Sequence, residues 1–134
     1  MRAVLDTNVL VRHLTADPPD QGRRATAFLA RAEELLLPDL VVAELVYALE
    51  SVYELGRPRV AELVRAVIAF PAIVVLDETL LLRALELYER ENYDFATSYL
   101  AASAERSGVG AVASFSRSLE SLKSVRLIEP RAPE

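Results

Sequence analysis

The sequence contains no cysteine and only one histidine, His13. Without cysteine, neither a disulfide scaffold nor a thiolate metal site can form. Because His13 is the only imidazole, any metal must be held by oxygen ligands. Oxygen ligands suit magnesium or manganese better than zinc. These absences restrict any metal chemistry of the chain to a hard divalent cation.

Long apolar runs and an excess of basic charge are also missing. No stretch approaches the roughly 20 apolar residues of a membrane span, and no signal peptide is visible, so we expect a cytoplasmic protein without a membrane partner. The net charge is −5, which argues against a broad basic surface for duplex binding. A nucleic-acid enzyme is not excluded, because local arginines and a bound cation can hold phosphate on an acidic protein.

What the chain does contain is typical of one packed domain. The 134 residues are 52% hydrophobic and 26% charged, which predicts a single globular domain over residues 1–134. Strands are expected at residues 1–5, 35–37, 73–76, 110–115 and 125–128. Helices are expected at residues 8–14, 21–34, 39–55, 59–70, 77–91 and 94–106, with a short helical turn at 116–122. Asp39 is expected to cap the third of these helices. This alternation predicts a three-layer α/β/α fold with a central parallel sheet of about five strands.

Asp6 is the most informative residue. It follows the first expected strand and opens the polar step Asp6-Thr7-Asn8 before the first helix. A carboxylate at the C-terminal end of a first strand lies where open α/β sheets hold their ligands. The alternative is a helix N-cap, for which aspartate is a favoured residue. Position alone leaves both interpretations open.

Two later carboxylates raise the same question. Glu44 has mostly apolar residues three and four positions away along its helix, and a buried lone carboxylate is costly unless it is paired, hydrogen-bonded or metal-bound. The alternative is a partly exposed glutamate beside Tyr47, or one paired with an arginine. Asp94 precedes an alanine-rich helix, where an ordinary cap is expected. One carboxylate oxygen can cap a helix while the other faces a site, so the two roles of Asp94 are compatible.

The chain as a whole resembles a PIN domain of the VapC type, the toxin half of bacterial and archaeal toxin–antitoxin pairs. The opening Val4-Leu5-Asp6-Thr7-Asn8-Val9-Leu10 and the order of motifs along the whole chain carry most of the resemblance. The later matching segments are residues 38–44, 93–96, 100–102, 112–115 and 125–130.

The resemblance implies that the first and fourth strands are neighbours and that acids cluster beside them. Family members gather about four acids around magnesium or manganese and cleave single-stranded or structured RNA. Asp6 and Glu44 match two of these acids. Asn8 and Ser114 match polar supporting positions.

The other two acid positions hold Thr97 and Ser116. Asp94 could serve as the third ligand only from one helical turn earlier, about 5 Å back along the axis. Two like charges about 5 Å apart repel by about 3 kcal/mol at an effective dielectric near 20, and the field of four such acids is what attracts a divalent ion. With two or three acids that attraction falls, so we expect weak Mg²⁺ or Mn²⁺ binding.

The resemblance therefore implies a metal-dependent endoribonuclease, and the two missing acids lead us to expect reduced activity. Asp6 would be the principal metal ligand, with Glu44 second and Asp94 third. The residues expected to position water or substrate are Asn8, Thr97, Ser114 and Ser116. The alternative is a catalytically inactive PIN-like fold that binds RNA or an antitoxin. The expected partners are an RNA substrate, a VapB-like antitoxin and a second copy of the chain in a homodimer.

Some of the arginines and the single histidine offer further candidates for phosphate contact. Arg12, Arg106 and Arg117 lie near the expected site in the sequence, although most arginines are simply solvated or paired. His13 is also close to the site in the sequence, but a packed or surface histidine is the more ordinary interpretation.

Overall fold

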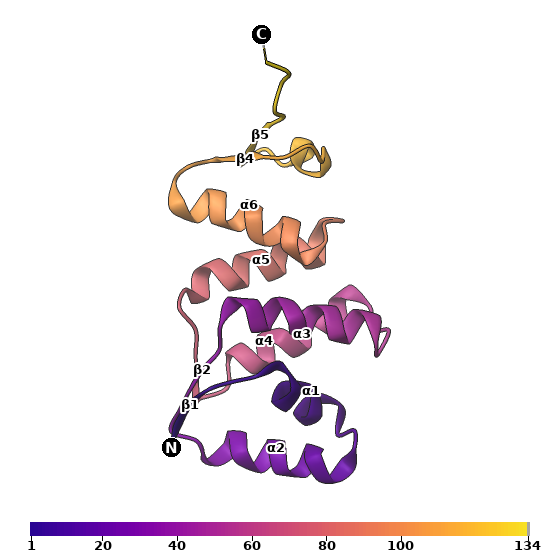
Figure 1. The fold of residues 1–134 in the computed structure, drawn as a ribbon, viewed down its shortest axis with the longest axis vertical. Coiled ribbons are helices and arrows are strands. Elements are labelled where there is room, and N and C mark those ends of the chain that lie inside the picture. The colour runs from indigo at the N-terminus through magenta and orange to yellow at the C-terminus, as the bar shows by residue number, and fades with distance from the viewer. Residues whose placement is uncertain (134) are drawn as a thin grey trace. The chain divides into compact units, whose positions relative to one another are not determined.

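The computed structural model describes residues 1–133 and divides the chain into two compact units, Met1–Glu78 and Thr79–Glu134. Each unit has its own parallel sheet and its own helices (Figure 1). None of the described helices is both long and apolar enough to cross a membrane.

The sheet of the first unit has three parallel strands in the order β1-β2-β3. β1 (Arg2–Val4) pairs with β2 (Glu34–Leu36) in a register that sets Val4 beside Leu36, and β3 (Ile73–Val74) pairs with the other edge of β2. Leu35 and Leu37 of the central segment are fully buried. Parallel strands buried among helices are expected to be apolar runs of this kind.

Four helices complete the first unit: α1 (Thr7–Thr15), α2 (Pro19–Arg31), α3 (Asp39–Ser51) and α4 (Arg57–Ile68). α1 contacts both α2 and α3, and α3 contacts α4. Figure 1 shows α1 and α2 side by side at the lower end of the view. Gly22 in α2 permits a close approach to α1, because a Cβ atom at this position would lie 2.6 Å from the Cα of Ala16.

The second unit consists of α5 (Glu78–Arg90), α6 (Phe95–Ser107), β4 (Ala111–Ala113), a short 3₁₀ helix (Ser118–Ser121) and β5 (Arg126–Ile128). β4 and β5 are parallel, and α6 contacts both β4 and the 3₁₀ helix. α6 ends at Gly108, whose φ of 80° is the left-handed conformation that favours glycine at a helix end. The rings of Tyr88 and Phe95 meet edge to face with centroids 6.2 Å apart.

The α/β class and the parallel pairing of all five strands confirm the sequence prediction, but the single five-stranded sheet is wrong in detail. The strands form one sheet of three and one sheet of two within the described residues. The expected contact between the first and fourth strands would join the two units, and it stays a prediction.

Several helix boundaries also differ from the sequence prediction. The helix expected to run to residue 34 ends at Arg31, because Glu33 donates its backbone N–H to the carbonyl of Met1 at 3.0 Å and Glu34 enters β2. Asp39 was expected to cap the third helix, whereas Pro38 occupies the cap position and Asp39 is the first helical residue. In the first case, pairing with β1 overrides a helical sequence pattern.

Candidate functional site

Asp6 lies directly after β1 and is the N-cap of α1. Its Oδ1 atom accepts a hydrogen bond from the backbone N–H of Thr7 at 2.7 Å, and its side chain is exposed. The capping alternative weighed from the sequence is therefore confirmed. Capping uses Oδ1, so the carboxylate is held in place while it remains open to solvent at the end of the strand.

Glu44 lies on α3, the helix that begins at the same edge of the sheet. β1 and β2 are parallel and in register, so their carboxyl ends meet at one edge, and α3 begins there with Asp39. Glu44 follows Asp39 by five residues, about 7.5 Å along a helix axis. Its side chain is exposed, as is that of Tyr47, which agrees with the alternative weighed from the sequence. The convergence of Asp6 and Glu44 on one pocket stays a prediction.

Asp39 is a carboxylate at this edge that the sequence analysis did not count as a site residue. It is half-buried and stands one residue beyond Pro38 at the carboxyl end of β2. The signal was present in the sequence, because the argument applied to Asp6, an acid directly after an apolar strand, applies equally to Asp39. Thr7 adds a buried hydroxyl oxygen that has no hydrogen-bond partner among the described residues.

The donor chemistry at this edge suits a hard cation, but the number of acids is small. Carboxylate, hydroxyl and amide oxygens from Asp6, Thr7, Asn8 and Glu44 are the ligand types that Mg²⁺ and Mn²⁺ prefer. Within either unit, the described residues contain no group of three or more acids or histidines arranged to hold a metal. A cation at this edge would therefore depend on few protein charges, and the weak binding expected from the sequence stays a prediction.

In the second unit, Asp94 is the N-cap of α6. Its Oδ1 atom accepts a hydrogen bond from the backbone N–H of Thr97 at 2.7 Å, and its backbone carbonyl accepts the Ser98 hydroxyl at 2.9 Å. The predicted cap is confirmed, and Thr97 is the residue whose backbone N–H donates to it. Whether Asp94 also contacts a metal stays a prediction.

The segment after β4 carries a short series of serine hydroxyls. Ser114 accepts the backbone N–H of Ser116 at 3.0 Å, and the hydroxyls of Ser116 and Ser118 are 2.9 Å apart. Ser116 also accepts the backbone N–H of Ser118 at 3.3 Å. These bonds order the turn that leads into the 3₁₀ helix, so Ser114 and Ser116 have a local structural role in the second unit.

His13 is packed within the first unit. Its Nδ1 atom lies 2.8 Å from the hydroxyl of Thr26, and its ring meets Phe70 edge to face at 6.0 Å. Partial burial lowers the pKa of His13, because removal from water disfavours the charged imidazolium. His13 therefore has the packed position that is the ordinary interpretation of a lone histidine.

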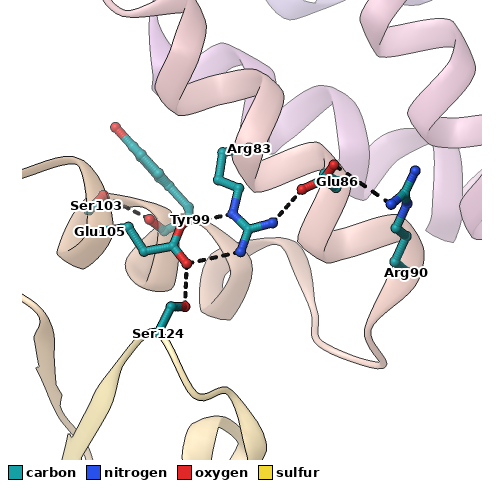
Figure 2. A network of polar contacts seen from close by, with 7 residues as sticks. All are labelled: Arg83, Glu86, Arg90, Tyr99, Ser103, Glu105 and Ser124. Atoms are coloured by element: carbon teal, nitrogen blue, oxygen red, sulfur yellow. Dashed lines mark hydrogen bonds and ion pairs between the residues drawn. The ribbon is translucent and has the colours of Figure 1, made fainter.

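A network of ion pairs in the second unit joins α5, α6 and the segment before β5 (Figure 2). Arg83 binds Glu105 with two hydrogen bonds, of 2.7 and 2.9 Å, and also binds Glu86. Ser124 donates its hydroxyl to Glu105. The hydrogen bonds from Arg83 lower the pKa of the Glu105 carboxyl and raise that of the guanidinium. The contact between Arg83 and Glu105 is a strong charge-assisted pair that joins α5 to α6, and its role is structural.

Comparison with known proteins identifies the family. The profile described as "PIN domain" matches residues 3–124, which span most of both units. The chain belongs to the PIN domain family. The family resemblance inferred from the opening residues and the order of motifs is thereby confirmed.

Within the PIN domain family, the chain is similar to the VapC type. It is 27% identical over 122 residues to a VapC ribonuclease of Aquifex aeolicus (strain VF5), a match that covers 89% of this chain and 90% of the relative. A crystal structure of VapBC2 from Rickettsia felis, bound to a DNA fragment from their promoter, aligns with 98% of this chain and 100% of the matched chain. That alignment has 13% identity and a TM-score of 0.38, a level that carries no functional argument.

Proposed function

We propose that this PIN domain is a metal-dependent endoribonuclease that hydrolyses RNA phosphodiester bonds with reduced activity. Membership of the PIN family and the similarity to a VapC ribonuclease support the nuclease class. The observation that carries the site assignment is the position of Asp6 and the start of α3 at the carboxyl ends of two paired parallel strands. Ligands of open α/β sheets bind at this edge.

In this proposal Asp6 is the principal ligand for Mg²⁺ or Mn²⁺, Glu44 the second and Asp94 the third. When bound, the cation would lower the pKa of water and offset charge on the phosphate. The bond from Thr7 N–H holds the Asp6 carboxylate in one orientation, which removes part of the entropy cost of binding. Asn8, Thr97, Ser114 and Ser116 would position water or RNA.

The VapC type further implies partners. We propose an RNA substrate, a VapB-like antitoxin and a homodimer in the cytoplasm. Co-expression with the product of a neighbouring short reading frame, followed by co-purification, tests the antitoxin. Sedimentation of the purified chain tests the homodimer.

The cleavage proposal is tested by calorimetric titration of Mn²⁺ and by cleavage of labelled RNA. Asp6→Asn is the decisive variant, because asparagine caps a helix about as well as aspartate but carries no charge. We expect Asp6→Asn and Glu44→Gln each to lower Mn²⁺ affinity by about tenfold or more and to remove most cleavage. The matched controls Asp17→Asn and Glu62→Gln change exposed acids elsewhere in the first unit and should behave as wild type. Wild-type cleavage by Asp6→Asn would contradict the proposal.

A second candidate function is an inactive PIN-like fold that binds RNA or an antitoxin. It is favoured by Thr97 and Ser116, which stand where the family usually has acids. The two candidates differ in one measurement. If the wild-type protein binds RNA in the presence of Mn²⁺ but does not cut it, the inactive fold is favoured.

A further inference from the structure

A groove between α1 and α2 in the first unit concentrates positive charge on an otherwise acidic protein. The groove has a volume of about 450 Å³ and is lined by Arg12 from α1 and by Arg24 and Arg31 from α2. None of its lining residues is acidic, although the chain has a net charge of −5. Three cations around one hollow, with no acid in its lining, form a local site for an anion.

The helical spacing explains why these side chains face one groove. Arg24, Phe28 and Arg31 are separated by four and three residues, so they lie on one face of α2. Asn8 and Arg12 are four residues apart on α1 and line the same groove. α1 and α2 contact each other, and Figure 1 shows both helices at the lower end of the view.

The arginines of the groove are available to a ligand. Arg12 is half-buried and its Nε atom donates to Gln21 at 2.8 Å, which orients the guanidinium and leaves its terminal N–H groups uncommitted by that bond. Arg24 pairs with Asp20 only at 3.7 Å, and both side chains are more than 70% exposed, so this pair is weak. Arg31 has no acidic partner within ion-pair distance among residues 1–133.

We infer that this arginine groove binds the sugar–phosphate backbone of single-stranded RNA beside the cleavage site. The inference rests on the proposed function, since it extends the path of the same substrate. Asn8 stands two residues beyond Asp6, and Arg12 lies about 9 Å further along the α1 axis than Asp6. A strand held at Asp6 would therefore meet the groove as it runs along α1.

The chemistry of the groove matches a single strand better than an acidic protein segment. Guanidinium groups bind phosphate oxygens with two parallel hydrogen bonds, and a strand presents one phosphate per nucleotide. Half-buried Phe28 stands between Arg24 and Arg31 on α2 and offers an aromatic face for an unstacked base. Alternating cationic and aromatic groups are the usual arrangement of single-strand binding sites.

Two adjacent arginines supply a matched pair of variants. Arg23 and Arg24 both lie in α2, both pair with Asp20, and their side chains are 74% and 76% exposed. Arg24 lines the groove and Arg23 does not. Any difference between Arg24→Gln and Arg23→Gln therefore reports the groove rather than the net charge of the protein.

The experiment measures binding of a fluorescein-labelled 12-nucleotide single-stranded RNA by anisotropy, in EDTA and over a range of salt concentrations. Each lost phosphate contact should lower the slope of log affinity against log salt by about 0.7, which is about fivefold in affinity at 0.1 M salt. We expect this loss for Arg24→Gln and for Arg31→Gln, whereas Arg23→Gln should match wild type. Circular dichroism confirms that each variant is folded.

Three results would overturn the inference. Equal affinities and salt slopes for Arg23→Gln and Arg24→Gln would show that the groove is not involved. An Arg31→Gln variant with wild-type affinity and salt slope would also show that the groove is not involved. A labelled polyglutamate 12-mer that binds as tightly as the RNA, and loses affinity equally in Arg24→Gln, would assign the groove to an acidic protein segment.

Failure of the groove can be distinguished from failure of the cleavage proposal. Binding in the groove needs no metal, so the anisotropy measured in EDTA reports the groove independently of cleavage. If the wild-type protein cuts no RNA but Arg24→Gln still binds it more weakly than Arg23→Gln, the groove stands and the cleavage proposal fails. If cleavage occurs and the two arginine variants bind RNA alike, the cleavage proposal stands and the groove inference fails.

Discussion

At the scale of single residues, the two carboxylates that begin helices have the same local geometry. Asp6 and Asp94 each use Oδ1 to accept a backbone N–H at 2.7 Å. This bond depends only on neighbours in the chain, and so the sequence was sufficient to predict it. Any role of the same carboxylates toward a metal depends on partners that are distant in the sequence.

The proposed placement of Thr97 and Ser116 at two acid positions of the family leads to a gain-of-function prediction. Thr97→Asp combined with Ser116→Asp should raise Mn²⁺ affinity and RNA cleavage by about tenfold or more, because each added carboxylate contributes charge and a ligand. Calorimetry and a cleavage assay measure the two effects. Thr79→Asp, at an exposed position in the first turn of α5, is a control for added charge. A double variant that binds no more metal than wild type would mean that the site has been misplaced.

At the scale of secondary-structure elements, the contact between α1 and α2 depends on Gly22. A Cβ atom there would meet the backbone of Ala16 at 2.6 Å, and a backbone atom cannot move aside as a flexible side chain can. We expect Gly22→Ala to lower the free energy of unfolding by about 1–3 kcal/mol, measured by urea denaturation. Gly56→Ala is the control, since the nearest atom to its Cβ is 3.9 Å away. Equal stability of the two variants would contradict this account of the helix contact.

The elements also show where local patterns mislead. Residues 32–34 continue an amphipathic helical pattern, yet Glu34 pairs with Arg2 across β1 and β2, with an ion pair of 2.9 Å. The energy of pairing a strand comes from residues far away in the chain, which a local pattern does not contain. Asp39 was assigned as the cap of the third helix, and the structure places Pro38 in that position instead.

At the scale of the whole molecule, stability should depend on pH through Glu105. Hydrogen bonds from Arg83 lower the folded pKa of this carboxyl, so their contribution is complete above the unfolded pKa of about 4.3 and is lost as the pH falls through the folded value. Glu105→Gln should cost about 1–2 kcal/mol at pH 7, and the difference from wild type should shrink below pH 4. Urea denaturation at several pH values measures this.

The control for this pH effect is the exposed pair Arg117–Glu120, which lies in the same unit with a separation of 3.0 Å. Glu120→Gln should be indistinguishable from wild type at each pH, because exposed ion pairs contribute little. A pH dependence that survives in Glu105→Gln would mean that another carboxylate governs acid unfolding.

By itself, the sequence determined the α/β class, the five parallel strands, the caps at Asp6 and Asp94, and the PIN resemblance. These features depend on apolar periodicity and on hydrogen bonds between near neighbours, both of which are readable along the chain. Only the tertiary structure decided the division of the strands into two sheets, the end of α2 at Arg31 and the gathering of Arg12, Arg24 and Arg31 around one groove. The sequence does not indicate which exposed helical arginines will be neighbours in space. Only the packing of α1 against α2 brings these three together.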